Sequence, residues 1–241
     1  MPPRYYLDTE FADNGLNDLR LISLALVCDD GRELYLCNSA WLGDDGQPDA
    51  SNADGWLREH VFPQLPYCKC PENSACRRGA LYFVHKSDCR WRRTPDMREM
   101  IIDFVKDPGN GERVEFWAYF ASYDWILLCW IFGRMLDLPK HFEWLVHDLR
   151  VWATTLGYTG KFKELVPDSG HHDALADARW NRDVHKILTK RFAQERDQRA
   201  TALVDCLDRL LLDLNCYTVD SSAREMILRD WPEIIAKSPY R

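Results

Sequence analysis

The stretch Tyr5–Phe11 carries two carboxylates, Asp8 and Glu10, two positions apart. In a β-strand, side chains alternate between the two faces, so both carboxylates would lie side by side on one face. Two adjacent carboxylates repel each other unless a cation lies between them, which makes the pair a candidate cation site. An edge strand that turns its charges to solvent is the alternative. The choice depends on whether the rest of the chain supplies more carboxylates to the same point.

Three further residues have types that suit such a site. Asp124 falls in the first turn of an expected helix, and His172 precedes Asp177 by five positions at the start of another. Each has a structural alternative, because a carboxylate in a first turn complements the helix dipole and a single histidine at a helix start is more often structural. Carboxylate oxygens are the ligands that Mg²⁺ and Mn²⁺ prefer, and histidine is the commonest general base.

These residues must be positioned by a mixture of strands and helices. The apolar patterns predict strands at 5–11, 19–28, 33–37, 114–119 and 144–149, and helices at 122–135, 150–156 and 171–192. The turn Asp29-Asp30-Gly31 predicts a hairpin between the second and third strands. In the last of these helices Ala174, Asp177, Ala178 and Asn181 share one face, whose small alanines would allow a close approach to a sheet. The tail 193–241 predicts two further helices, the second starting at Ser222.

The composition favours a folded globular protein. The chain has 241 residues with 46% apolar content, enough for one domain of about 150 to 200 residues plus an appendage, or for two small domains. It contains no apolar run of transmembrane length and no signal-peptide core, so we expect a cytoplasmic protein without a membrane partner. The net charge of −7 argues against non-specific coating of nucleic acid, although it does not exclude an enzyme with a local basic region.

Residues 67–93 differ from the rest of the chain, and we interpret them as an insertion. They hold seven basic and two acidic residues, a net charge of +5, and four of the nine cysteines: Cys68, Cys70, Cys76 and Cys89. The four thiols could hold a tetrahedral Zn²⁺, with His85 as a substitute ligand, although reduced thiols without a metal are the equal alternative. We also expect the insertion to contact the substrate backbone through Arg77, Arg78, Arg92 and Arg93.

Three runs of the sequence together carry a resemblance to a known family. They are Tyr6–Phe11, Ala118–Asp124 and His172–Asn181, in this order. The chain resembles the DEDDh 3'-to-5' exonucleases of the ribonuclease H-like fold, and within them it is most similar to the mycobacterial-type polyadenylate-specific 3'-exoribonucleases. The resemblance covers roughly residues 4 to 188, and the cysteine-rich insertion departs from it.

The resemblance implies roles for the site residues. Asp8 would bridge two Mg²⁺ or Mn²⁺ ions, Glu10 and Asp177 would hold the first, and Asp124 would act on the second. His172 would deprotonate the attacking water. Thr9, Phe11 and Trp125 flank the motifs as candidate substrate-binding residues, and for the two aromatic rings core packing is equally open.

The sequence thus predicts an α/β, ribonuclease H-like mixed sheet with flanking helices, a cysteine-rich insertion at 67–93 and a helical C-terminal extension. We expect an exonuclease domain at 1–192 and the extension at 193–241. The expected function is metal-dependent 3'-5' release of nucleoside 5'-monophosphates from single-stranded RNA or 3' overhangs. A DNA exonuclease of proofreading or repair type and a catalytically inactive nucleic-acid-binding module are the alternatives. Whether the chain forms a homodimer stays open.

Overall fold

The computed structural model describes residues 2–15, 18–71, 74, 76, 89–167 and 172–213, with the single residues 225 and 229. The strands are β1 (Arg4–Asp13), β2 (Leu19–Cys28), β3 (Glu33–Asn38), β4 (Trp91–Arg92), β5 (Val114–Ala118) and β6 (Phe142–Asp148). The helices are α1 (Gly55–His60), α2 (Thr94–Phe104), α3 (Ser122–Phe132), α4 (Leu149–Thr155) and α5 (Ala174–Asp213). Short 3-10 turns lie at Ser39–Trp41, Phe62–Gln64, Met135–Asp137 and Phe162–Glu164.

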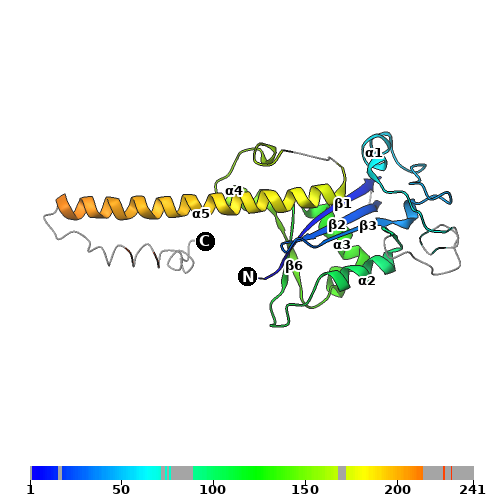
Figure 1. Cartoon of the computed structure of the whole chain (residues 1–241), viewed down its shortest axis with the longest axis horizontal. Coiled ribbons are helices and arrows are strands. Elements are labelled where there is room, and N and C mark those ends of the chain that lie inside the picture. Colours follow the sequence, from blue (N-terminus) through cyan, green and yellow to red (C-terminus); the bar gives the residue numbers. More distant parts are fainter. Residues whose placement is uncertain are drawn as a thin grey trace. The chain divides into compact units, whose positions relative to one another are not determined.

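The strands form one mixed sheet in the order β4-β3-β2-β1-β5-β6 (Figure 1). β1, β2 and β3 are an antiparallel meander, as the hairpin pattern predicts, whereas β5 and β6 run parallel to β1. β1 therefore has a hydrogen-bonded neighbour on each side, and the edge-strand alternative for its two carboxylates is wrong. The mixed sheet with flanking helices confirms the α/β, ribonuclease H-like expectation.

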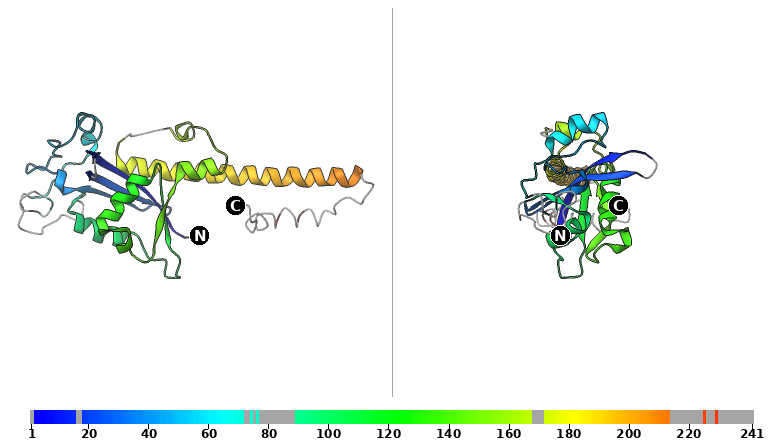
Figure 2. Two further views of the ribbon diagram at one scale, coloured as in Figure 1. Left: turned by 180° about the vertical axis from the view of Figure 1, so that it is seen from behind. Right: turned by 90° about the vertical axis from the view of Figure 1, so that its right-hand side faces the viewer.

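The two faces of β1 are covered by different helices because its side chains alternate. Tyr5 and Leu7 point into a hydrophobic core that includes Met97 and Ile101 of α2 and apolar residues of α3. The next residue, Tyr6, faces the other way and contacts His185 of α5, with 2.8 Å between the Tyr6 hydroxyl and His185 Nδ1. Figures 1 and 2 show α2 and α3 on one side of the sheet and the first turns of α5 on the other.

The first turns of α5 pack closely against β1, as the small residues predict. Ala174 and Ala178 are fully buried. The side-chain amide of Asn181 donates to the Leu7 carbonyl at 3.1 Å, a bond between a helix side chain and a strand backbone. This close approach brings the start of α5 to the same strand that carries Asp8 and Glu10.

The C-terminal ends of two helices differ from the sequence prediction. α3 ends at Phe132 rather than at 135, because Gly133 takes a φ of 103°, a left-handed conformation that ends helices. α5 continues to Asp213 instead of ending near 192, since residues 193–213 contain neither proline nor glycine to stop it. The helix expected from Ser222 lies outside the described residues.

The chain divides into two compact units, residues 1–185 and 186–241. The first contains the sheet and the helices that pack on it. In the second, the described part of α5 carries the ion pair Arg191–Glu195 one turn apart. Among the described residues, no helix combines the length and the apolar character needed to cross a bilayer.

Candidate active site

Three carboxylates meet where β1 and the first turn of α5 come together. Asp8, Glu10 and Asp177 each place one oxygen so that the three oxygens lie within 4.8 Å of one another. Glu10 is buried, whereas Asp8 and Asp177 are half-buried. The shared face that a strand period of two predicts for Asp8 and Glu10 is thus the face that α5 covers.

Asp124 reaches this region from α3. The hydroxyl of Thr9, which lies between Asp8 and Glu10 in the chain, donates to Asp124 Oδ1 at 2.6 Å, and both residues are buried. The negative charge of Asp124 raises the pKa of both Asp8 and Glu10, so all four carboxylates belong to one electrostatic group. Thr9, which the sequence predicts as a substrate contact, orients the Asp124 carboxylate through this hydrogen bond.

Burial and mutual repulsion favour the protonated forms of these acids. Loss of hydration raises the pKa of Glu10 to about 8, with further contributions from Asp177 and Asp124. Loss of hydration is also the largest cause that raises the pKa of Asp8, and the negative charge of Asp124 is the second largest. Loss of hydration raises the pKa of Asp124 to about 6, although hydrogen bonds from Thr9 act in the opposite direction. A bound cation reverses this balance, because its positive charge favours the ionised carboxylates.

The donor set fits hard divalent cations. Its oxygens come from carboxylates alone, which is what Mg²⁺ and Mn²⁺ prefer, and three of the four acids are close enough to share one ion. Soft or borderline metals favour sulfur and nitrogen ligands instead.

His172 lies just before α5 and is tied to the same acids through its backbone. Its N–H donates to Asp177 Oδ2 at 3.2 Å. Its φ of 66° is in the left-handed region, which is uncommon for a residue other than glycine and often marks functional positions. Its ring packs edge to face against Trp56 of α1, with 4.5 Å between ring centroids, and lies 5.9 Å from the ring of His60.

Two acids near the site are not singled out by any local sequence pattern. Asp148 at the end of β6 accepts from the backbone N–H groups of Ala121, Arg150 and Val151, and its charge raises the pKa of Asp124. Asp173 caps α5 by accepting from the Ala176 N–H at 2.9 Å, and it raises the pKa of Asp8 and Glu10. Both acids look like ordinary helix caps in the sequence, so only their position relative to other strands distinguishes them.

The two candidate stacking residues have different surroundings. The ring of Trp125 is buried in the core against Phe116, with 5.4 Å between ring centroids, which supports the packing alternative. Phe11 is half-buried and its ring lies 5.3 Å from that of Tyr123, which is exposed. Of the two, Phe11 retains a surface that a base could contact.

A cavity of about 350 Å³ is lined in part by residues that come just after β5 and β6 in the chain, and its lining combines cationic with aromatic side chains. It is lined by Tyr119, Phe120, Arg150, Gly160, Lys161, Phe162, Lys163 and Trp180. Phe120, four residues before Asp124 in the chain, is 65% exposed. Trp180 lies one helical turn after Asp177. No sequence pattern predicts this cavity, because its residues come from four separate segments.

Of the four arginines of the basic insertion that were expected to contact substrate, the structure describes Arg92 and Arg93. Arg92 is buried, with Nη1 donating to the Trp91 carbonyl at 2.9 Å, so the prediction that it contacts substrate is wrong. Arg93 pairs with Asp96. Arg77, Arg78 and His85 lie outside the described residues. The four cysteines of the insertion form a separate cluster.

Comparison with known proteins identifies relatives over most of the chain. The family model described as "3'-5' exoribonuclease Rv2179c-like domain" matches residues 73–189. The 3'-5' exoribonucleases Rv2179c and MT2234.1, from the H37Rv and CDC 1551 strains of Mycobacterium tuberculosis, are each 30% identical to the chain over 186 residues. Each of these matches covers 73% of this chain and 87% of the relative.

A solved structure is also similar. It is a moderately thermophilic Exonuclease I from Methylocaldum szegediense, with 14% identity and a TM-score of 0.46. The match covers 85% of this chain and 46% of the other, so the chain spans less than half the length of that exonuclease.

Proposed function

Because the chain belongs to the 3'-5' exoribonuclease Rv2179c-like family, we propose that it is a divalent-cation-dependent 3'-5' exonuclease that releases nucleoside 5'-monophosphates. The observation that carries this proposal is the meeting of three carboxylates within 4.8 Å at the junction of β1 and α5. Asp124, held by Thr9, adds a fourth from another element.

Each acid has an assigned role in this proposal. Asp8, Glu10 and Asp177 would hold the first ion, and Asp8 with Asp124 the second. Bound divalent ions supply charge stabilisation for the attacking and leaving oxygens of a phosphodiester. The protein contributes the fixed positions of these acids: Thr9 restrains Asp124, and the His172 N–H restrains Asp177.

His172 is proposed as the general base that accepts a proton on its imidazole from the attacking water. Its position is supported on two sides, since its backbone binds Asp177 and its ring packs on Trp56. Trp56 is therefore proposed as a positioning residue.

We propose single-stranded RNA or a 3' overhang as the substrate, with part of the strand in the cavity that Arg150, Lys161 and Lys163 line. Cationic side chains attract phosphates, and the exposed ring of Phe120 offers a surface on which a base could stack without regard to sequence. This local group of cations accommodates a polyanion on a chain whose net charge is −7. We further propose a cytoplasmic location, where such RNA occurs.

The test is a cleavage assay on purified protein with single-stranded RNA and DNA of one sequence. A 5' label should yield a ladder that shortens from the 3' end, and a 3' label should appear at once as mononucleotide. Cleavage should require Mg²⁺ or Mn²⁺ and stop in EDTA. Asp8→Asn is the matched inactive control, and Lys163→Ala should raise KM more than it lowers kcat.

The alternatives predict different outcomes of the same assay. Faster shortening of DNA than of RNA would support a DNA exonuclease. Binding of either strand without any shortening would support an inactive binding module. Cleavage that persists in EDTA would contradict the proposed site.

A further inference from the structure

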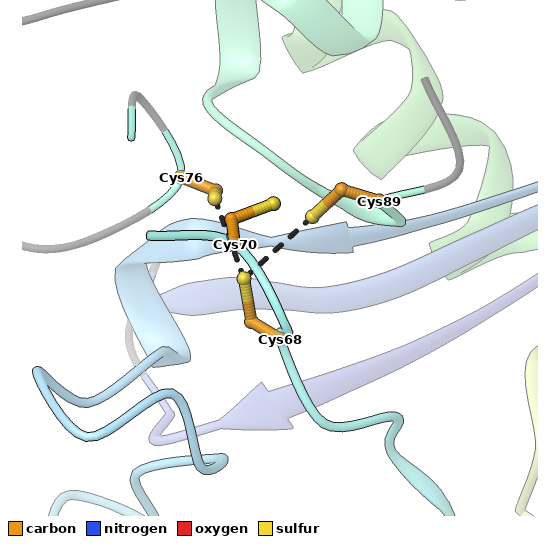
Figure 3. A group of neighbouring side chains, drawn as sticks. All are labelled: Cys68, Cys70, Cys76 and Cys89. Atoms are coloured by element: carbon orange, nitrogen blue, oxygen red, sulfur yellow. Dashed lines mark hydrogen bonds between the residues drawn. The ribbon is translucent and has the colours of Figure 1, made fainter. Parts of the chain in front are cut away.

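Four cysteine thiols meet at the sheet edge formed by β3 and β4. The Sγ atoms of Cys68, Cys70, Cys76 and Cys89 all lie within 4.8 Å of one another, and the side chains point toward a common centre (Figure 3). The first three are buried and Cys89 is half-buried. We call these four residues the cysteine cluster.

The sulfur spacing matches a metal site better than it matches disulfides. Cys68 Sγ lies 3.4 Å from Cys76 Sγ and 3.7 Å from Cys89 Sγ. A tetrahedral Zn²⁺ with bonds of about 2.3 Å to sulfur requires sulfur atoms about 3.8 Å apart. A disulfide requires about 2.05 Å. No disulfide links any cysteine within the described part of the chain.

The cluster joins the segment that carries Cys68, Cys70 and Cys76 to the residues just before β4. The backbone N–H of Cys68 donates to the Gly46 carbonyl at 2.9 Å, and the Trp91 indole donates to the Pro66 carbonyl at 2.7 Å. Cys89 lies two residues before Trp91, the first residue of β4, which has only two residues and pairs with the end of β3. A bond through the cluster would therefore fix both the 66–76 segment and the start of β4.

We propose that the cysteine cluster binds one structural Zn²⁺ that attaches the cysteine-rich insertion to the β3–β4 edge. Four thiolates complete a tetrahedral shell and leave no position for water, which is the arrangement of structural rather than catalytic zinc. An insertion of this length is too short to bury a sufficient core of its own, and metal binding supplies the missing stabilisation. The proposal is independent of the exonuclease assignment, because the cluster shares no residue with the carboxylate site.

Metal analysis of the full-length chain, purified under reducing conditions without added metal and desalted, tests the proposal. We expect about one zinc per chain in the wild type and in Asp8→Asn, because four thiolates form a closed structural zinc site whose metal binding is coupled to folding. Cys68→Ser and Cys89→Ser should lose most of the zinc. Cys129→Ala is the matched control: it removes a buried thiol outside the cluster and should keep the metal.

A second measurement needs only the wild-type protein, in case the cysteine variants do not fold. Exchange of the metal for Co²⁺ should give the intense visible and sulfur-to-metal absorption of tetrahedral thiolate coordination. The proposal would be overturned if the protein contained no metal and thiol titration found the four cysteines accessible. It would also be overturned if the protein contained no metal and its intact mass showed disulfides. Zinc that is retained by both cysteine variants would overturn it as well.

Discussion

Glu10→Gln should stabilise the metal-free protein at alkaline pH while removing its activity. Glu10 is buried beside Asp177 and Asp124, and this environment raises its pKa from 4.5 to about 8. Above that pH the native state must hold a buried negative charge next to other carboxylates. Glutamine has nearly the same shape, carries no charge, and its amide N–H can donate to the neighbouring acids.

The sign and size follow from proton linkage. Unfolded Glu10 releases its proton near 4.5, whereas folded Glu10 keeps it to about 8, so between these values the native state binds more protons. The contribution of Glu10 to the free energy of unfolding of the metal-free protein is therefore largest below pH 4.5 and falls as the pH rises toward 8. The full difference between the folded and unfolded pKa of Glu10 corresponds to about 5 kcal/mol of free energy of unfolding. Because the neighbouring acids also take up protons, we expect a measured gain of about 2 kcal/mol for the variant, or about 4 to 8 °C in Tm.

The assay is thermal unfolding in EDTA and in Mg²⁺ from pH 5.5 to 8.5. The wild type in EDTA should lose Tm with rising pH more steeply than the variant, and Mg²⁺ should raise the Tm of the wild type more than that of the variant. Glu112→Gln, a change at an exposed loop residue, is the control and should leave the wild-type pattern unchanged. If Glu10→Gln melts at or below the wild type in EDTA at pH 8.5, or if both show the same pH slope, the electrostatic reasoning is refuted.

Asp8→Asn should abolish cleavage with the fold intact by circular dichroism, and more than a few per cent residual activity in Mg²⁺ would contradict its proposed bridging role. His172→Ala should slow turnover by about 10² to 10⁴-fold without changing the affinity for Mg²⁺. The wild-type rate should rise from about pH 6, and the variant should lack this rise. If the variant instead loses Mg²⁺, His172 is a metal ligand and not the general base. Trp56→Ala should lower kcat by loosening the His172 ring, and Trp56→Phe should restore it; equal rates for all three proteins would exclude a positioning role. Thr9→Val removes a hydrogen bond that lowers the pKa of Asp124, so the activity profile should move to higher pH, and an unmoved profile would argue against this coupling.

Local patterns in the sequence determined several parts of the site. The alternation along residues 5–11 places Asp8 and Glu10 on one face, and the helical spacing of Ala174, Ala178 and Asn181 identifies the face of α5 that packs on β1. Both inferences depend on periods of two and 3.6 residues, which hold wherever a strand or helix forms. The three runs that carry the family resemblance are likewise short and local, so residue type and order alone reveal them.

Other features were decided only by contacts between distant segments. Thr9 and Asp124 are 115 positions apart, so their hydrogen bond exists only because α3 packs beside β1. Asp148 looks like a simple helix cap in the sequence, yet the parallel pairing of β5 and β6 brings it near Asp124.

Contacts between distant segments also decide where the cysteines and the His172 ring lie. The spacing of the cysteine cluster matches no common zinc pattern, and its sulfur atoms meet because the sheet edge brings Cys89 back to Cys68. Likewise, the ring of His172 finds its neighbour Trp56 on a helix that begins 117 positions earlier in the chain. Residue type and local period define what a segment can offer, whereas tertiary packing determines which of these groups come close enough to act together.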